Sequence, residues 1–474
     1  MRSRWFIILF LLSSSILAAV LLEGCANIVP PLGGPRDSLP PRIVAIHPAD
    51  STLHFNEKKI EMSFDEYVTL ENALQNVLVT PTPKVNPIVE SRLKTVTVRI
   101  KDTLEANTTY VIDFGKAIRD VNEGNPLKNY RYIFSTGNYF DSLEFRGRVQ
   151  LAETGKTDST LIVMLHRDFT DSAVFKEKPR YYTRVDTTGA FHFQNLAPGT
   201  YAVYAVKDEG GSLRYMNPET LFAFADQPVA INGATQPMTL YAYAEPAPVK
   251  APKAPSTTTT PKKKKDDEVE DKRLRMINSL EAGAQDVLKP LTLTFPDPLK
   301  SFDSTKLILT DKAFKPLPYT ITRDTTNKIF TLAYTWPLDQ EFHLISEKDM
   351  AADSLGKSTL KTDTVNFRTM KESDYGSIRF RFNNVDTARH PVLQLLQNGK
   401  VMYHYPITGK ELMIRRFRPA EFEMNVLYDD NGNGRWDYGI FFGPTRRQPE
   451  IVMAIPRKLT IKGNWDNEAE ITLK

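Results

Sequence analysis

The feature that most limits the fold of this 474-residue chain is a series of short segments in which apolar and polar residues alternate. A side-chain period of two predicts strands of antiparallel sheets that are buried on one face. About seven such strands with turn residues between them, in roughly 95 residues, are typical of a β-sandwich. We therefore predict an all-β protein built from tandem sandwiches, and the clearest of the early strands are expected at 60–64, 96–100, 110–114 and 130–134.

Length and charge narrow the class of protein further. A chain of 474 residues is long enough for about three or four domains. Lys and Arg number 61 against 57 Asp and Glu, and a net charge of +4 is too small and too dispersed to indicate a nucleic-acid partner. The single cysteine, Cys25, excludes a disulfide within the chain, so sheets and apolar cores must hold the domains together.

The N-terminal residues have the pattern of a targeting signal. Arg2 and Arg4 precede an apolar run over 5–22, which ends on Leu22-Glu23-Gly24-Cys25. This order resembles a bacterial lipoprotein signal, although Glu23 stands where that family has a small residue. The resemblance implies that 1–24 is removed and that Cys25 carries acyl chains. The alternative is an uncleaved transmembrane anchor, and both interpretations place the rest of the chain outside the cytoplasm.

Two segments have the composition of connectors. Residues 25–41 are rich in proline and glycine, so we expect a tether between the lipid and the first domain. Residues 245–275 combine prolines, a threonine run and a lysine run beside acidic residues. Such a composition cannot fill a core, and the opposite charges nearly cancel, so we predict a disordered linker rather than a patch for anionic lipid or polysaccharide.

The first predicted sandwich, at 42–137, resembles a known family. The segments that carry the resemblance are Pro40-Pro41-Arg42-Ile43, His47-Pro48, Met62-Ser63-Phe64-Asp65-Glu66, 104–110 and Phe134-Ser135-Thr136-Gly137. They are similar to the bacterial Ig-like domains of the SbsA type. The resemblance implies a sandwich fold and no shared catalytic residues.

A second signature falls in 138–244. Asp186 and Gly189 close a tight turn, Phe191 and Phe193 point inward, and Pro198-Gly199 leads into another strand. This part resembles the prealbumin-like or CnaB-like sandwiches of exported proteins. Some relatives form an internal Lys-to-Asn isopeptide bond, but no such trio of residues can be aligned here, so we do not expect the bond.

The second half of the chain repeats the first. Residues 291–295 and 364–369 match the early and final strands of the Ig-like sandwich. Residues 417–429 align with 196–208 without a gap, so that Pro419 matches Pro198 and Asp429 matches Asp208. We predict a second, divergent Ig-like sandwich at 276–370 and a second prealbumin-like sandwich at 371–474.

One stretch has the spacing of a calcium loop. Asp429, Asn431, Asn433 and Asp437 supply oxygen side chains, and Gly434 permits a sharp turn. Ile440 occupies the position where an EF-hand has its bidentate Glu, so the stretch is instead similar to the Asp-x-Asp-x-Asp-Gly-x-x-Asp loops of extracellular repeat proteins. The alternative is a plain hairpin turn, because Asn-Gly pairs are ordinary turn residues.

No catalytic constellation appears in the sequence. The seven histidines show no metal-ligand spacing and no Ser-His-Asp order, and we expect each at the surface, with His192 facing away from the core. The adjacent carboxylates Asp65-Glu66 and Asp429-Asp430 would point to opposite faces of a strand and could not flank one glycosidic bond. We therefore predict that the protein is not an enzyme and needs no cofactor, with calcium as the one candidate ligand.

These features predict a non-catalytic, lipid-anchored cell-envelope protein that presents or spaces a binding surface. We expect anchoring in the outer membrane with the periplasmic face favoured, because no acidic cluster follows Cys25. The partner is an envelope protein or a glycan. The alternative function is an outer-membrane glycan-binding lipoprotein or a cryptic glycan hydrolase, whose exposed aromatic rings would stack on sugars; the candidates are Tyr139, Phe140, Trp436, Tyr438, Phe441 and Phe442.

Overall fold

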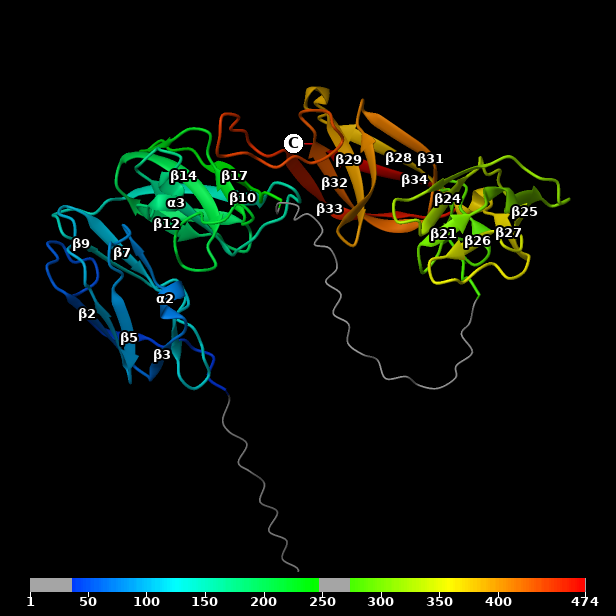
Figure 1. Cartoon of the computed structure of the whole chain (residues 1–474). Coiled ribbons are helices and arrows are strands. Elements are labelled where there is room, and N and C mark those ends of the chain that lie inside the picture. The colour runs from blue at the N-terminus through cyan, green and yellow to red at the C-terminus, as the bar shows by residue number, and fades with distance from the viewer. Residues whose placement is uncertain (1–35, 247–272, 474) are drawn as a thin grey trace, which may run out of the picture. The chain divides into compact units, whose positions relative to one another are not determined.

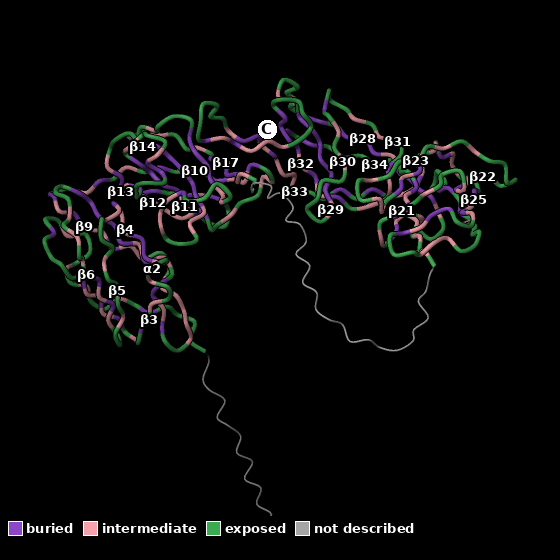
Figure 2. Tube along the Cα trace, viewed as in Figure 1, coloured by how far each residue is buried: buried purple, intermediate pink, exposed green. Residues whose placement is uncertain are grey.

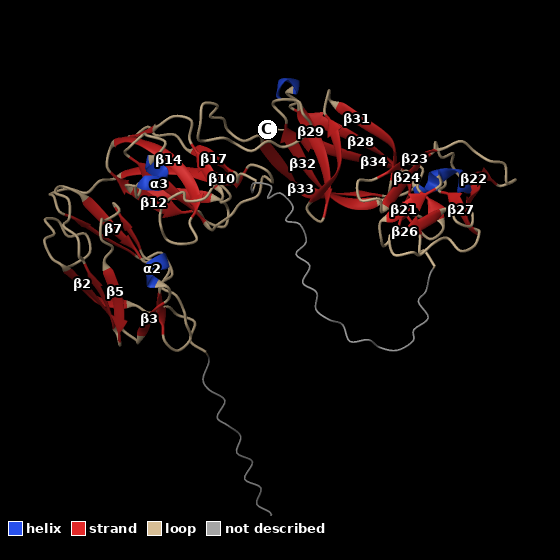
Figure 3. Ribbon diagram, viewed as in Figure 1, coloured by secondary structure: helices blue, strands red, loops and turns tan. Residues whose placement is uncertain are grey.

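The computed structural model describes residues 36–246 and 273–473 (Figure 1). Nearly every element is a strand, which confirms the prediction of an all-β chain of sandwiches (Figure 3). The described residues fall into two compact units, the first reaching Ser142 and including Asn195–Ala197, and the second holding the rest. The signal segment with Cys25, most of the tether and most of the 245–275 linker lie outside the described residues.

The first unit contains the first predicted sandwich. Its strands alternate as predicted, since Ile60, Met62 and Phe64 are almost fully buried while the residues between them are not. The strands form three sheets, and Figure 2 shows in purple which segments of the chain are buried. In sheet order they are β1 (Ile43–His47), β2 (Lys59–Phe64), β6 (Thr95–Arg99) and β5 (Ile88–Arg92); β4 (Leu78–Thr80), β7 (Thr109–Asp113) and β9 (Arg131–Ser135); β3 (Val68–Leu70) and β8 (Ile118–Asp120), with a short helix α2 (Ala73–Asn76).

The second sandwich opens the second unit. A three-stranded sheet faces a larger one, and Phe191 and Phe193 are buried on β13 as predicted. The parallel pairing of β10 with β17 closes the smaller sheet. In sheet order the strands are β13 (Ala190–Leu196), β10 (Leu143–Leu151) and β17 (Met238–Ala242); β12 (Tyr181–Arg184), β11 (Leu161–His166), β14 (Gly199–Lys207) and β15 (Phe222–Phe224), with β16 (Val229–Ile231) also on β14 and a short helix α3 (Ala173–Lys176).

The third sandwich has a core of rings around Trp336, which lies 5.3 Å from Phe342 and 5.6 Å from Phe367 between ring centroids. In sheet order its strands are β18 (Ile277–Asn278), β20 (Leu291–Thr294), β24 (Ile329–Ala333) and β23 (Thr320–Arg323); β19 (Ala284–Gln285), β27 (Asp363–Thr369), β25 (Glu341–Ser346) and β22 (Leu307–Asp311); β21 (Leu299–Phe302) and β26 (Ala351–Asp353), with a 3₁₀ turn at Ser304–Lys306.

The fourth sandwich shows the clearest alternation. Ile378, Phe380 and Phe382 on β28 are buried, while Arg379 and Arg381 between them are exposed. In sheet order its strands are β31 (Glu411–Phe417), β28 (Gly376–Asn383) and β34 (Asp466–Thr472); β30 (Lys400–Pro406), β29 (Pro391–Gln397), β32 (Ala420–Tyr428) and β33 (Ile451–Ile461), with 3₁₀ turns at Glu372–Asp374 and Thr387–Arg389.

The strand orders repeat. The sheet β13-β10-β17 has the same order as β31-β28-β34, and β12-β11-β14-β15 has the same order as β30-β29-β32-β33. The parallel β10–β17 pair has its counterpart in the parallel β28–β34 pair. The first and third sandwiches agree in the same way, since β1-β2-β6-β5 corresponds to β18-β20-β24-β23.

Two expectations about single residues are wrong. His166, expected at the surface, is 2% exposed at the end of β11. Phe441, proposed as an exposed ring, is 1% exposed. His166 belongs to the larger sheet of the second sandwich, and Phe441 packs against that sandwich. A pattern within one strand does not reveal a covering segment from far along the chain.

Candidate functional site

The candidate calcium stretch begins the long loop 429–450 between β32 and β33. Asp429 is 2% exposed, and its carboxylate accepts hydrogen bonds from the backbone N–H groups of Asn433 (3.1 Å) and Gly434 (2.6 Å). Gly434 adopts a φ of 78°, a left-handed conformation that glycine takes without strain. The buried carboxylate therefore closes a tight turn at the start of the loop.

The other predicted ligands gather on the same turn. The side-chain amides of Asn431 and Asn433 both donate to Oδ2 of Asp437, the latter over 2.8 Å. The Oδ1 atoms of the two amides accept from the backbone N–H groups of Asn433 (3.0 Å) and Arg435 (2.7 Å). The structure thus brings all four predicted side chains into one hydrogen-bonded loop.

Glu450 is a fifth member that the sequence analysis missed. It stands one residue before β33 and is 6% exposed. Its Oε2 atom accepts from the N–H of Asp437 over 3.0 Å, and its own N–H donates to the carbonyl of Asp437 over 3.0 Å. Its other carboxylate oxygen, Oε1, is buried without a hydrogen-bond partner.

The electrostatic setting of Glu450 is unfavourable for its charge. Burial raises the pKa of its carboxyl, and the nearby negative charges of Asp429 and Asp437 raise this pKa further. Three carboxylates therefore repel one another around one turn. Among residues 36–246 and 273–473, however, no group of three or more His, Cys, Asp or Glu side chains is arranged so that it could hold a metal ion. Calcium binding by this loop remains a prediction.

The second half of the loop packs into the second sandwich. The ring of Phe441 lies 5.1 Å from Phe222, 5.0 Å from Phe224 and 5.6 Å from Tyr204, between centroids. The indole Nε1–H of Trp436 donates to the carbonyl of Glu450 over 2.7 Å, which ties this aromatic segment to the carboxylate turn. Phe441 is thus part of a core rather than a free ring for ligands.

Polar contacts surround this aromatic cluster. Arg446 lies 4.6 Å from the ring centroids of both Phe224 and Phe441, and it donates to Asp171 over 3.1 Å. The amide of Gln448 donates to the carbonyl of Phe224 (3.0 Å) and to Asp226 (2.8 Å). The loop is therefore held to the second sandwich by apolar burial and directional bonds together.

Two glycines allow the second and fourth sandwiches to pack closely against each other. A Cβ atom on Gly439 would come within 2.7 Å of the Tyr243 ring. A Cβ atom on Gly155 would come within 2.6 Å of the carbonyl oxygen of Val452, whose N–H donates to Ala152 over 2.8 Å. Side chains at these positions would push the packed segments apart.

A signal for this covering loop was present in the sequence. Strand β14 reads Tyr201-Ala202-Val203-Tyr204-Ala205-Val206, and all six residues are buried. A continuous apolar run indicates a strand covered on both faces, so the positions opposite the sandwich core need a partner. Ala202, Tyr204 and Val206 find it in the cluster that includes Phe441.

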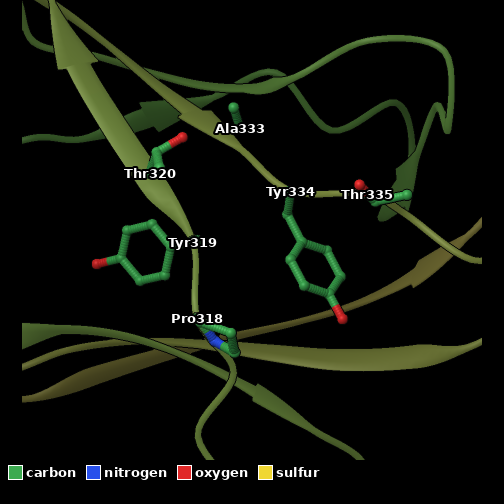
Figure 4. A pocket seen from close by; sticks show the side chains of 6 residues that line it. All are labelled: Pro318, Tyr319, Thr320, Ala333, Tyr334 and Thr335. Carbon is green, nitrogen blue, oxygen red and sulfur yellow. The ribbon is translucent and has the colours of Figure 1, made fainter.

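A separate pocket of about 380 Å³ lies on the third sandwich (Figure 4). It is lined by Pro318, Tyr319, Thr320, Ala333, Tyr334 and Thr335. The Tyr319 hydroxyl donates to the carbonyl of Leu307, and the Tyr334 ring packs 5.0 Å from Trp336. The pocket offers two rings and hydroxyl groups, and its lining contains no carboxylate or histidine for acid–base chemistry.

The histidines do not form a catalytic group. His192 is exposed and bonded to Glu144 over 3.1 Å, as expected for a side chain facing away from the core. Burial lowers the pKa of His166 to about 4, so this ring is neutral near pH 7. Its Nε2 atom is buried without a hydrogen-bond partner, and its ring packs edge-on against Tyr204.

No helix in the described part of the chain is long and apolar enough to cross a membrane. The predicted lipid site at Cys25 lies outside the described residues.

Comparison with known proteins identifies one part of the chain. Residues 37–136 match the family model of the bacterial Ig-like domain, so the first sandwich is a domain of this class. No curated protein matches the sequence. The match covers less than half of the chain and does not assign the other sandwiches.

Solved structures give distant likenesses. The Bacillus anthracis TIE protein is 11% identical, with 93% of this chain and 75% of that chain covered and a TM-score of 0.17. The major pilin subunit BcpA of Bacillus cereus is 10% identical, with 69% and 99% covered and a TM-score of 0.17. The N-terminal part of the bacterial S-layer protein SbsC is 15% identical, with 44% of each chain covered and a TM-score of 0.15. At TM-scores this low, none of these likenesses carries an argument about function.

Proposed function

We propose that this protein is a non-catalytic, lipid-anchored component of the bacterial cell envelope, whose sandwiches present or space a binding surface. The observation that carries the proposal is the order in which two segments follow each other in the N-terminal half of the chain. A lipoprotein-like signal ending on Cys25 stands directly before a bacterial Ig-like domain at 37–136. An acylated cysteine followed by a short tether would hold this domain close to a membrane.

The contacts within the second unit support a structural role. The loop 429–450 of the fourth sandwich inserts Phe441 among buried rings of the second sandwich. Tyr375 bonds to Asp286 over 2.8 Å and thereby links the start of the fourth sandwich to the third. Domains joined by buried contacts transmit position and force, which is what a spacer requires.

Labelling with a palmitate analogue tests the anchor. The wild-type chain should incorporate label in the membrane fraction, and Cys25→Ala should incorporate none and should lose membrane retention. Ser38→Ala, which leaves the signal and the cysteine intact, is the matched control and should label like the wild type. Equal label in the Cys25→Ala chain would overturn the lipid anchor, and a membrane-bound chain without any label would favour the uncleaved transmembrane segment.

We place the domains on the periplasmic face of the outer membrane, because no acidic cluster follows Cys25. Protease treatment of intact cells distinguishes the two faces. A periplasmic protein stays whole until the outer membrane is permeabilised. Cleavage of the predicted linker at 245–275 in intact cells would instead place the domains on the cell surface.

A glycan-binding lipoprotein is the second candidate. It is supported by Tyr139, which is 49% exposed, and by the pocket that Tyr319 and Tyr334 line on the third sandwich. Flat aromatic faces bind sugar rings through stacking. Reproducible micromolar binding on a glycan array, lost in Tyr334→Ala, would favour this function over a spacer. A silent array would leave the spacer function.

A further inference from the structure

Within the loop 429–450, Oε1 of Glu450 is the one buried side-chain oxygen or nitrogen that has no hydrogen-bond partner. Its side chain is more than nine-tenths buried, and Oε2 is bonded to the N–H of Asp437. Its second oxygen, Oε1, is buried without a partner. A buried carboxylate oxygen with no donor costs free energy unless a cation or a donor completes it.

The carboxylates around Glu450 supply no donor. Asp429 is 2% exposed and Asp437 is half-buried, and both lie close enough to oppose the negative charge of Glu450. Lys and Arg side chains form no ion pair with these three carboxylates among the described residues. Among the described residues, the three carboxylates therefore concentrate negative charge that no ion-paired Lys or Arg side chain balances.

We propose that Asp429, Asn431, Asn433, Asp437 and Glu450 together form a calcium site. Glu450 supplies the carboxylate that the loop's own twelfth position, Ile440, lacks. It reaches the turn from the start of β33, where backbone pairing with Asp437 fixes its position. This inference does not depend on the lipid anchor.

The ligand chemistry selects calcium. All five side chains offer oxygen, and no His or Cys belongs to the set, which disfavours zinc and other transition metals. Calcium accepts six to eight oxygens in flexible geometry, whereas magnesium requires a near-ideal octahedron. A site with three carboxylates and two amides therefore fits calcium better than magnesium.

Binding requires a small rearrangement of the amides. The amide nitrogens of Asn431 and Asn433 now donate to Asp437, so the carboxylates alone do not gather into a metal site. Rotation of each exposed amide about its last side-chain bond would turn its oxygen toward Asp437 and Glu450. An ion would then take the place of the two N–H groups beside Asp437.

The counterpart loop shows which feature is specific to this site. Asp208 closes its turn as Asp429 does, by accepting from Ser212 (3.0 Å) and Leu213 (2.7 Å). The stretch after Asp208 reads Glu-Gly-Gly-Ser, so a glycine stands at the position of Asn431 and a serine at the position of Asn433. The backbone hydrogen bonds to the aspartate are therefore common to both turns, and the buried Oε1 atom of Glu450 is the observation that indicates an ion at the second one.

Terbium luminescence of the purified full chain tests the proposal. Tb³⁺ replaces Ca²⁺ at oxygen sites, and Trp436 stands inside the loop with its indole bonded to the carbonyl of Glu450, where it can sensitise the ion. Wild type should show saturable emission that calcium competes away at about 0.1 to 1 mM, as in extracellular modules. Trp436→Phe should lose the emission although calcium still binds by calorimetry.

Two ligand variants and one matched control decide the outcome. Glu450→Gln and Asp437→Asn should each weaken calcium binding at least tenfold. Asp430→Asn removes an exposed carboxylate from the same loop that is not in the ligand set, and it should bind like the wild type. Unchanged binding in Glu450→Gln, an equal loss in Asp430→Asn, or no calcium-competed emission in the wild type would each overturn the site.

Folding of the variants is checked separately. Hydrogen exchange of β33 in chelator should match between wild type and Glu450→Gln, because glutamine keeps the acceptor for the N–H of Asp437. If Glu450→Gln exchanges faster than the wild type in chelator, this variant has lost structure. The calcium affinity of Asp437→Asn then decides between the two outcomes.

Discussion

Asp208 and Asp429 occupy equivalent positions in two sandwiches, and each accepts hydrogen bonds from the backbone N–H groups four and five residues further along the chain. The positions match because 417–429 aligns with 196–208 without a gap. The shared role of the aspartate is therefore to close the turn that follows the long strand, and any role in ion binding is an addition in the second loop.

We predict that Asp208→Ala and Asp429→Ala each destabilise their own sandwich by about 2 to 4 kcal/mol, because each leaves two N–H groups without a charged acceptor. Hydrogen exchange of peptides that cover the ends of β14 and β32 measures the effect locally. If calcium binds as proposed, only Asp429→Ala also removes a calcium-dependent protection. Loss of protection in one loop but not in the other, in chelator, would contradict a shared turn-closing role.

Phe441→Ala should destabilise the second sandwich, although residue 441 belongs to the fourth. The substitution removes a buried ring from the cluster around Phe222 and Phe224 and leaves a cavity, which costs about 3 to 5 kcal/mol. Exchange of β15 and limited proteolysis of the loop 429–450 should both accelerate. Phe442→Ala is the control, since Phe442 is 36% exposed, and it should have a much smaller effect. Equal effects of the two substitutions would contradict the insertion.

Tyr375→Phe should weaken the link between the third and fourth sandwiches. The Tyr375 hydroxyl donates to the buried Asp286 over 2.8 Å and accepts from the N–H of Val287 over 2.9 Å. Its removal leaves the N–H of Val287 without this acceptor and leaves Oδ1 of Asp286 with the N–H of Leu288 as its donor. We expect a loss of about 1 to 3 kcal/mol in the stability of this contact. A double-mutant cycle with Asp286→Ala, followed by thermal unfolding, should show non-additive losses, whereas strictly additive losses would mean that the two residues do not interact.

The sandwiches could be predicted from the sequence because the alternation of apolar and polar residues within one strand indicates which of its faces is buried. Ile60, Met62 and Phe64 alternate with polar residues, and the pattern in one strand suffices to indicate a sheet with one buried face. Short strands such as β3 and β8 contain only three residues each and carry no usable period.

Only part of the candidate calcium site could be predicted, because the rest of it comes from a distant part of the sequence. Asp429, Asn431, Asn433 and Asp437 follow a recognisable spacing, but Glu450 lies 13 residues beyond Asp437 and joins them only through the start of β33. The burial of Phe441 and His166 depends on contacts between distant parts of the chain, which no local pattern contains. The continuous apolar run of β14 indicated that a cover exists, but not which segment supplies it.

His166 gives a prediction about pH. Its folded-state pKa is lowered to about 4 by burial, against an ordinary value of 6.5, and Asp168 opposes this shift only in part. A histidine that is buried neutral contributes fully above pH 6.5, and its contribution is lost as the pH falls toward 4, because the unfolded chain takes up the proton first. At about 1.4 kcal/mol per pKa unit, the loss is roughly 3 kcal/mol at most.

The test compares wild type with His166→Phe, which keeps a ring against Tyr204 but cannot be protonated. Hydrogen exchange of peptides covering β11 should show that wild type loses protection relative to the variant between pH 6.5 and 4, after correction for intrinsic rates. His404→Gln, at an exposed position on β30, should follow the wild type. If the wild type and His166→Phe lose protection in parallel over this range, the buried histidine is not the group that titrates.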